Sequence, residues 1–461
     1  MDEILSEMLS EKGQKLIILR NFKFSFHKKL AGDVERWKCV KRLCKAFIKL
    51  ENGVLVEDQA NHVGHAAEAE GSLLRQKISN TLKRRATECI SERPAKIIRQ
   101  EISKCSDGPS VTANDMDRFR KNLSAAKLRT FPKLPKSMPD LHTKFGGFQS
   151  SGHTKTSTGE EFVFLHDTVN NIIIFTTAVN LDALKSAVII FIDGTFKSAP
   201  PQFYQIFTIF IKKNSFYIPV VYGLLPDKKV ETYSLFFQAM SEFTINCEIV
   251  FVDFEQSIHS ALTLTWFHIE IRGCRFHLAQ SWWRRIQSLG LTIEFKNKDS
   301  IVGRILRLFF GLPLLPPDEV RDFFVEELMA IKPSDEPKLD AFFDYVLDNY
   351  ISENAPFPPE MWAKFCIDED TTTNCCESFH GKLNKEIPGS HPNIFCCCKI
   401  LINMQIDTYA KLKSCNMRKP SKKNRLKREY IERCMLKLKT YEYSRFEFVK
   451  RVSFKFLPSR L

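Results

Sequence analysis

The chain has 461 residues, of which 44% are apolar and 26% charged, and its formal net charge is +14. This length allows about three domains, and the apolar share supports folded cores rather than a disordered chain. The amino terminus lacks the basic-then-apolar pattern of a signal peptide, and no apolar run reaches the roughly 18 residues of a membrane span. We therefore expect a soluble protein with no membrane partner. Its 14 cysteines include adjacent ones, at 375–376 and 396–398, which favours a reducing compartment over a disulfide framework.

Two cysteines and two histidines near the amino terminus form the first candidate site: Cys39, Cys44, His62 and His65. Two thiolates and two imidazoles can complete a tetrahedral Zn²⁺ shell. Apolar and aromatic runs at 15–18 and 22–26 predict short strands, and Trp37 lies two residues before the first cysteine. We predict a small β-rich zinc finger over residues 1–70. The alternative is a chance scatter of Cys and His, which would leave the order of these aromatic residues unexplained.

A basic stretch from Lys83 to Arg99 follows this unit. We expect it to lie on helices of a linker region over residues 71–140. Residues 129–136 contain two prolines and predict the boundary loop before the next domain.

The central part of the chain predicts a mixed α/β sheet. Strand-like runs cover 186–192, 203–211 and 216–224, and a helical pattern over 229–243 leads into a strand that ends before Asp253. A helix-connected return of this kind implies a parallel neighbour strand. With a helix from Gln256 and a short strand at 269–274, the order is that of an α/β ribonuclease H-like catalytic domain.

Acidic residues mark the chemistry of this domain. Asp193 and Asp253 each follow an apolar strand, where open α/β sheets place their functional groups. With Glu377 from a later helix, they could hold two divalent cations, Mg²⁺ or Mn²⁺, about 3.5 to 4 Å apart, as phosphodiester chemistry requires. Single aspartates after strands are usually turn or helix caps. Glu386 on the same predicted helix and the acidic run at 368–370 compete for the third position.

Other residues near the acids have both a functional and a structural interpretation. Cys274 and His277 form a Cys-x2-His pair after a strand, which either supports the active site, together with His380, or is a buried pair at a strand-to-helix junction. A zinc site there would need further ligands, for which the cysteines at 375–376 and 396–398 have no convincing spacing. Trp282 and Trp283 could stack on a base, although tryptophans on a helix more often belong to the core. Arg284 and Arg285 are candidate DNA contacts.

Two further segments complete the domain plan. Residues 291–365 show apolar stripes at helical spacing, interrupted by prolines, and predict an all-helical insertion before Glu377. Residues 411–461 contain 17 basic and 4 acidic residues, a net +13 of the chain's +14. We expect a basic tail over 406–461 that binds DNA phosphates, although an import signal or a merely solvated end fits the same composition. Its candidate contacts are Lys422, Lys423, Arg425, Lys427 and Arg428.

Several motifs resemble those of a Mutator-like element (MULE) transposase domain over roughly 160–405. They include Asp-Gly-Thr-Phe at 193–196, Asp-Phe-Glu at 253–255 and Gly-Cys-Arg-Phe-His-Leu-Ala-Gln at 273–280. The resemblance implies that Asp193, Asp253 and Glu377 form the DDE triad of cut-and-paste transposition. The amino-terminal unit resembles a FLYWCH-type zinc finger. It departs from that family in having Arg36 before the tryptophan and His-x2-His in place of His-x-His.

The combined interpretation is a nuclear, DNA-binding transposase of the DDE type that cuts and joins DNA at transposon ends. Zn²⁺ would serve the finger, and Mg²⁺ or Mn²⁺ the acids. The runner-up is a domesticated zinc-finger regulator that retains the fold without the activity. A purely structural interaction protein would leave the order of the acids and the finger unexplained. The expected partner is double-stranded DNA at transposon ends, and the chain could also form a homo-oligomer.

Overall fold

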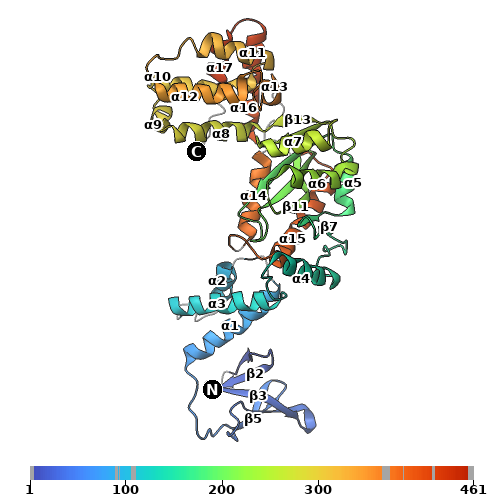
Figure 1. Ribbon diagram of the computed structural model, residues 1–461. Helices are drawn as coiled ribbons and strands as arrows, with labels where there is room; N and C mark the ends of the chain where they lie inside the picture. Colours follow the sequence, from blue (N-terminus) through green and yellow to red (C-terminus); the bar gives the residue numbers. More distant parts are fainter. Residues whose placement is uncertain are drawn as a thin grey trace. The chain divides into compact units, whose positions relative to one another are not determined.

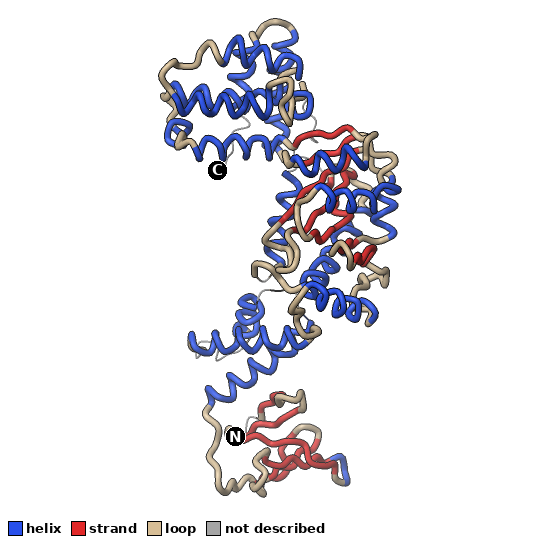
Figure 2. Tube along the Cα trace, in the orientation of Figure 1, coloured by secondary structure: helices blue, strands red, loops and turns tan. Residues whose placement is uncertain are grey.

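The computed structural model describes residues 5–88, 92, 94–104, 111–365, 374–387, 389–417 and 421–454. Contacts divide the chain into two compact units, residues 1–134 with 386–388, and residues 135–385 with 389–461. Figures 1 and 2 show that the strands gather into two separate sheets, one in each unit. Within the described ranges, no helix has the length and apolar character needed to cross a bilayer.

The first unit begins with a six-stranded antiparallel meander in the order β1-β2-β3-β4-β5-β6. A short 3₁₀ turn, η1 (Ala31–Asp33), joins β3 to β4. Phe24, Trp37 and Ile48 lie almost fully buried on one face and form the core of this sheet. The strands expected around residues 15–26 are thus confirmed. The strands are β1 (Ser6–Leu9), β2 (Lys15–Leu19), β3 (Phe22–Lys29), β4 (Val34–Cys39), β5 (Phe47–Glu51) and β6 (Val54–Gln59).

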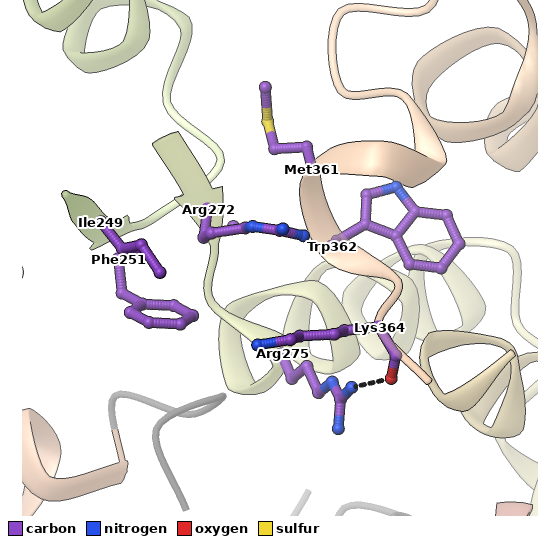
Figure 3. Close-up of a pocket in the computed structure, with 8 residues that line it drawn as sticks. Ile249, Phe251, Arg272, Arg275, Met361, Trp362 and Lys364 are labelled. Atoms are coloured by element: carbon purple, nitrogen blue, oxygen red, sulfur yellow. Dashed lines mark hydrogen bonds between the residues drawn. The ribbon is translucent and has the colours of Figure 1, made fainter. Parts of the chain in front are cut away.

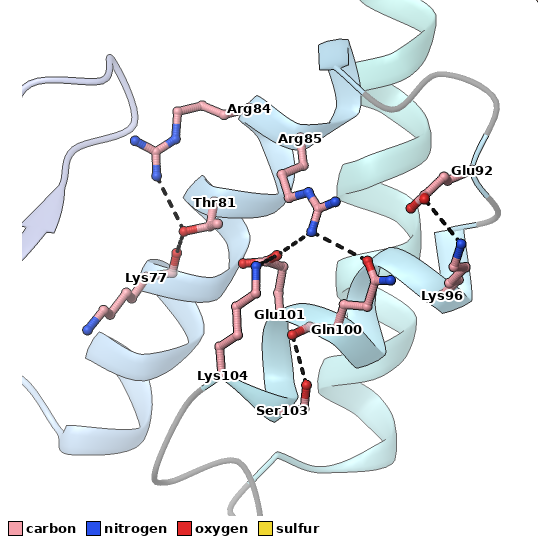
Figure 4. A network of polar contacts seen from close by, with 10 residues as sticks. All are labelled: Lys77, Thr81, Arg84, Arg85, Glu92, Lys96, Gln100, Glu101, Ser103 and Lys104. Carbon is pink, nitrogen blue, oxygen red and sulfur yellow. Dashed lines mark hydrogen bonds and ion pairs between the residues drawn. The ribbon is translucent and has the colours of Figure 1, made fainter. Parts of the chain in front are cut away.

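Three helices follow in the same unit: α1 (Glu70–Glu88), α2 (Pro94–Ser103) and α3 (Ala113–Arg129). They share a small apolar core that includes Leu82, Ile98 and Leu123. Figure 4 shows the polar network that ties α1 to α2, in which Arg85 and Lys104 contact Glu101 at 2.7 and 2.8 Å. Burial opposes the charge on Glu101, but these two cations outweigh it and lower the pKa of the carboxyl. The helices predicted after the finger therefore form a packed group with its own core.

The second unit contains a seven-stranded mixed sheet in the order β13-β12-β9-β10-β11-β8-β7. Strands β9, β10 and β11 are antiparallel neighbours, whereas β12 pairs in parallel with both β9 and β13. The predicted meander, connecting helix and parallel return are confirmed by these pairings. The hairpin β7–β8 and the helices α4 and α5 were not predicted. The elements are α4 (Met138–Ser150), β7 (Val163–Asp167), β8 (Ile172–Phe175), α5 (Ala178–Lys185), β9 (Ile189–Thr195), β10 (Gln205–Lys213), β11 (Phe216–Leu225), α6 (Val230–Met240), η3 (Ser241–Phe243), β12 (Ile249–Val252), α7 (Gln256–Thr265) and β13 (Glu270–Gly273).

The two faces of this sheet are covered by different helices. On one face, alternate residues of β9 and β12, such as Ile192 and Val250, pack with α5, α6 and α7 in a large apolar core. On the other, Phe191 and Phe251 stack with ring centroids 5.1 Å apart and meet α14 (Asn374–Glu386) through Phe379. Because side chains alternate along a strand, Asp193 and the position of Asp253 belong to this second face. Helix α14 therefore covers the face that carries the acids.

Most of the remaining helices of the second unit build one apolar core around Trp282 and Trp283 of α8, whereas α15 packs against β11 and α4. Helices α16 and α17 contribute residues to this core, so much of the segment expected as a basic tail is folded against the predicted insertion. The elements are α8 (Arg275–Ser288), α9 (Thr292–Lys296), α10 (Ile301–Leu308), η4 (Phe309–Leu314), α11 (Pro317–Asp322), the π-helical turns η5 (Phe323–Leu328) and η6 (Leu347–Ile351), α12 (Pro337–Val346), α13 (Pro359–Trp362), α15 (Ile394–Lys413), α16 (Lys422–Lys439) and α17 (Arg445–Ser453).

The packing of α17 predicts a large stability difference between two of its phenylalanines. Phe448 is fully buried in the helical core, whereas Phe454 just after the helix is 55% exposed. We expect Phe448→Ala to cost about 3–5 kcal/mol because it leaves a cavity, and Phe454→Ala to cost less than about 0.5 kcal/mol. Urea unfolding followed by tryptophan fluorescence measures both, since Trp282, Trp283 and Trp362 lie in this core. Equal urea midpoints for the two variants would show that α17 does not stabilise the helical core.

Candidate active site and metal centre

The parallel pairing of β9 and β12 places two carboxylates side by side. Ile189 pairs with Ile249 and Phe191 with Phe251. The same register continued by two residues brings Asp193 level with Asp253, and neighbouring strands lie about 4.8 Å apart. Asp193 was expected after its strand but lies within β9, where it pairs with Thr208 of β10. The antiparallel partner β10 extends further than β12 and keeps β9 extended beyond the acid.

The two acids differ in exposure. Asp193 is 7% exposed, and its Oδ1 accepts a hydrogen bond from the Gly194 amide at 2.8 Å. Burial raises the pKa of Asp193 to about 6, with the charge of Asp253 adding to the rise and that of His277 opposing it. The side chain of Asp253 is 43% exposed, and its Oδ1 accepts a hydrogen bond from the Phe254 amide at 2.6 Å. One carboxylate is thus held inside the fold while its neighbour faces solvent.

Each acid has a histidine beside it. His277 of α8 lies with Nδ1 3.7 Å from Oδ1 of Asp253, and His380 of α14 lies with Nδ1 3.5 Å from Oδ2 of Asp193. Burial lowers the pKa of His277, but Cys274 and both aspartates outweigh it and raise the pKa to about 10. Burial and the charge of His277 lower the pKa of His380 to about 4. His277 is therefore the more basic of the two imidazoles that flank the carboxylates.

His259, which the sequence interpretation missed, fixes the loop that carries Asp253. Its Nε2 donates to the backbone carbonyl of Asp253 at 2.8 Å, and burial lowers its pKa. The ring is therefore neutral, with its proton on Nε2. His259 lies six residues after Asp253, in the first turns of α7. A histidine in the helix that directly follows Asp253 is the sequence signal that could have identified His259.

Helix α14 brings Glu377 to the same region of the fold. Glu377 lies one helical turn before His380, the residue that contacts Asp193. Its own side chain lies outside the described residues, as do the competing acids at 368–370 and Thr373. Glu386 is the last residue of α14, more than one turn beyond His380. The path of the helix therefore agrees with Glu377 as the third acid, which stays a prediction.

A small pocket lies at β12 and β13. Figure 3 shows Phe251 on one side and Arg272, Met361 and Trp362 on the other. Below them, the buried guanidinium of Arg275 donates to the carbonyl oxygens of Lys364 and Pro313 at 2.9 and 2.8 Å. This cation thus fastens the start of α8 to the helical insertion. The candidate acids are not among the residues that line the pocket.

Burial changes the interpretation of the tryptophan and arginine candidates on α8. Trp283 is 2% exposed and packs against Phe295, so its ring is core and is not available to stack on a base. Arg285 lies 5.2 Å from the ring of Tyr345 and donates to the carbonyl of Ala341 at 3.4 Å. These contacts link α8 to α12. Arg284 is exposed and remains a predicted DNA contact.

The four amino-terminal Cys and His residues come together as predicted. Their ligand atoms, from Cys39, Cys44, His62 and His65, all lie within 4.8 Å of one another. Each sulfur lies 3.4 Å from a histidine nitrogen, and the two nitrogens are 3.2 Å apart. Zn–S and Zn–N bonds of about 2.3 and 2.0–2.1 Å in a tetrahedron give edges of about 3.3–3.8 Å between such atoms. The cluster therefore has the size of a zinc shell and suggests zinc binding.

Neighbouring groups orient these ligands. His65 Nδ1 lies 3.3 Å from the Ala66 carbonyl, which leaves Nε2 free to face the cluster. The ring of His62 stacks on Phe22 at 3.6 Å. Although burial opposes it, hydrogen bonds from the Ala46 amide and from His65 lower the pKa of Cys44 to about 7. These neighbours therefore favour the thiolate of Cys44, whereas burial raises the pKa of Cys39.

No second Cys/His cluster of this kind occurs within the described residues. Cys376 is buried against the sheet, and Cys396, Cys397 and Cys398 are buried on α15. These cysteines serve as small apolar residues. Cys274 is likewise buried, and it contributes to the site through its neighbour His277.

The five candidate DNA contacts of α16 lie near its amino-terminal end. Lys422, Lys423, Arg425 and Arg428 are exposed, and Lys427 is half-buried. Arg425 and Arg428 form ion pairs with Glu429 and Glu432, one turn further along the helix. Two of the five cations are therefore partly neutralised within the helix.

Comparison with known families gives one result in this region. Residues 189–281 match the MULE transposase domain, and a search of curated proteins found no match. The matched segment runs from β9 into α8 and contains Asp193, Asp253, Cys274 and His277, but not Glu377. The resemblance drawn from the sequence motifs is thus confirmed over this segment. It suggests a transposase-related function and, in general, an interaction with DNA: over residues 189–281, which contain strands β9 to β13 of the mixed sheet, the chain carries a MULE transposase domain.

Proposed function

We propose that this protein is a DNA-binding, DDE-type transposase of the Mutator-like class. The observation that carries the proposal is the register of β9 and β12, which brings Asp193 within β9 level with Asp253 just after β12, inside the segment that matches the transposase family. The order β11-β10-β9-β12-β13, with three antiparallel and two parallel strands, supports a ribonuclease H-like fold for this part of the chain.

Asp193 and Asp253 would hold Mg²⁺ or Mn²⁺, and Glu377 would complete the site. Paired hard carboxylates are suitable ligands for these cations. When bound, the cations would activate a water or a 3′-hydroxyl and stabilise the leaving oxygen of a phosphodiester. His277 and His380 would orient the carboxylates, and His259 holds the backbone of Asp253. These residues would position the acids on a rigid sheet before DNA arrives.

Three parts of the chain would bind double-stranded DNA. The β-rich Cys/His unit resembles a FLYWCH-type zinc finger and would read the transposon end. Exposed cations of α16, such as Lys422 and Lys423, and Arg284 of α8 would neutralise phosphates without reading sequence. A protein that acts on chromosomal DNA would work in the nucleus. Self-association would bring two transposon ends together.

Cleavage by the purified full chain tests the proposal. We expect supercoiled plasmid carrying the element's terminal repeats to be nicked in Mg²⁺ or Mn²⁺ and to stay intact in Ca²⁺, because Ca²⁺ accepts looser geometry and larger coordination numbers. Agarose gels measure the nicked fraction. Binding to the repeats without cleavage under any of these metals would instead identify a domesticated regulator that has lost its activity.

A further inference from the structure

Two aromatic side chains stand exposed beside the acids. Phe196 is 43% exposed and Tyr204 is 51% exposed, and their rings meet edge to face at 5.4 Å. The ammonium of Lys228 lies 4.9 Å from the ring of Phe196 and 5.8 Å from that of Tyr204. Large aromatic surfaces are usually buried, so an exposed pair with a cation points to a binding surface.

The topology places this aromatic pair at the same sheet edge as the acids. Phe196 follows the carboxyl end of β9, which carries Asp193. Because β10 and β11 are antiparallel to their neighbours, Tyr204 just before β10 and Lys228 just after β11 emerge at this edge too. Four strand ends thus bring the acids, the aromatic pair and Lys228 together.

A hydrogen-bonded chain fixes Lys228 and Tyr204 relative to the acids. Lys228 forms an ion pair with Glu255, which follows Asp253 by two residues. Tyr233 donates to Glu255 at 2.8 Å, and Gln205, next to Tyr204, donates to Tyr233 at 2.8 Å. Gly194 allows this arrangement, because a Cβ there would lie 2.3 Å from Oε1 of Gln205. The network therefore joins Glu255, two residues after Asp253, to the end of the loop that follows Asp193.

The loop between Phe196 and Tyr204 is also anchored at its far side. Ser198 donates to Asn384 of α14 at 2.6 Å. The amide of His391 donates to the carbonyl of Lys197 at 2.9 Å, and its ring lies 3.1 Å from the carbonyl of Ala199. A surface held in this way loses little conformational entropy on binding, which favours affinity.

We propose that Phe196 and Tyr204 form a stacking platform for an unpaired nucleobase of the DNA strand whose backbone reaches Asp193 and Asp253. This inference rests on the proposed function. It adds that the DNA strand bound at the acids is unpaired next to the phosphate that is cut. Aromatic faces take any base because every base has a π surface, so the platform selects unpaired DNA rather than sequence. Lys197 and Lys228 supply positive charge toward the neighbouring phosphates.

Binding of the full chain to two DNA probes tests the platform. The probes are a blunt duplex and the same duplex with a short single-stranded 3′ overhang containing 2-aminopurine, both in Ca²⁺ so that no cleavage is needed. We expect tighter binding to the overhang and quenched 2-aminopurine fluorescence. Phe196→Ala and Tyr204→Ala should each weaken overhang binding by about 5- to 100-fold, while blunt-duplex affinity stays close to that of the wild type.

Matched variants distinguish stacking from other effects. Tyr204→Phe keeps the ring and should retain the overhang preference, whereas Phe196→Leu keeps apolar volume without a π face and should lose it. Phe267→Ala removes an 85% exposed ring before β13, at the opposite edge of the sheet, and should change nothing. No overhang preference in the wild type, or Phe196→Leu binding like the wild type, would overturn the platform. Asp193→Asn should still prefer the overhang, so a protein that stacks the base but never cleaves would refute only the proposed function.

Discussion

Asp193→Asn and Asp253→Asn are each expected to reduce metal-dependent DNA cleavage by at least about 10²-fold, more than the 10- to 100-fold typical of groups that only support a metal site. Each change removes a charged ligand of the candidate site without changing side-chain volume. Because Asn has nearly the same shape as Asp, neither substitution opens a cavity at buried Asp193 or at half-exposed Asp253. Plasmid nicking rates in Mn²⁺ measure the effect, and DNA affinity in Ca²⁺ should stay near the wild-type value.

Matched variants locate the third acid and exclude a general effect of charge. Glu377→Gln should behave like the two aspartate variants, whereas Glu386→Gln at the end of α14 should be nearly silent. Asp182→Asn changes an exposed carboxylate of α5 and should leave the nicking rate unchanged. His380→Gln should fall between these extremes. If Asp193→Asn and Asp253→Asn nick at the wild-type rate, the carboxylate pair is not the active site. If Glu377→Gln nicks normally and Glu386→Gln is inactive, Glu386 rather than Glu377 is the third acid.

Removal of zinc is expected to unfold the amino-terminal sheet and to leave the second unit folded. Zinc binding to structural Cys/His sites supplies about 10–16 kcal/mol at pH 7. The sheet has only a small apolar core around Phe24, Trp37 and Ile48 to replace it. The purified chain should contain one zinc per molecule, and Co²⁺ in its place should give the d–d absorption of a tetrahedral site. Hydrogen exchange should show β3, β4 and β5 losing protection on chelation while β9 to β12 keep theirs.

Cysteine variants provide the control for the zinc prediction. Cys44→Ser removes one predicted ligand and should lower both the zinc content and the protection of the sheet. Cys415→Ser removes an exposed cysteine after α15 and should match the wild type in both. Two results would show that the cluster does not bind a structural metal. One is that chelator leaves the hydrogen-exchange protection of the sheet unchanged, and the other is that Cys44→Ser leaves the zinc content unchanged.

Local sequence patterns predicted much of the catalytic sheet. The alternation and length of the apolar runs predicted β9 to β13 and α6, because buried strands and amphipathic helices impose these periods directly. The hairpin β7–β8 was missed, since Ile172–Phe175 is a short run of apolar residues without alternation. The spacing of Cys39, Cys44, His62 and His65 was also sufficient to predict that they form one cluster. Few chains combine four such ligands with strands rich in aromatic residues by chance.

Other properties depended on contacts between residues far apart in the sequence. Such contacts bury Trp283 and fold α17 onto the helical core. They also bring His259 against the backbone carbonyl of Asp253. The pairing of Phe196 with Tyr204 likewise requires two loops to meet at one sheet edge. By itself, the sequence determined which residues could bind a metal or stack on a base, because that depends on side-chain chemistry and spacing. Only the tertiary structure decided which of them are buried, paired or exposed, because burial and distance depend on the packing of the whole unit.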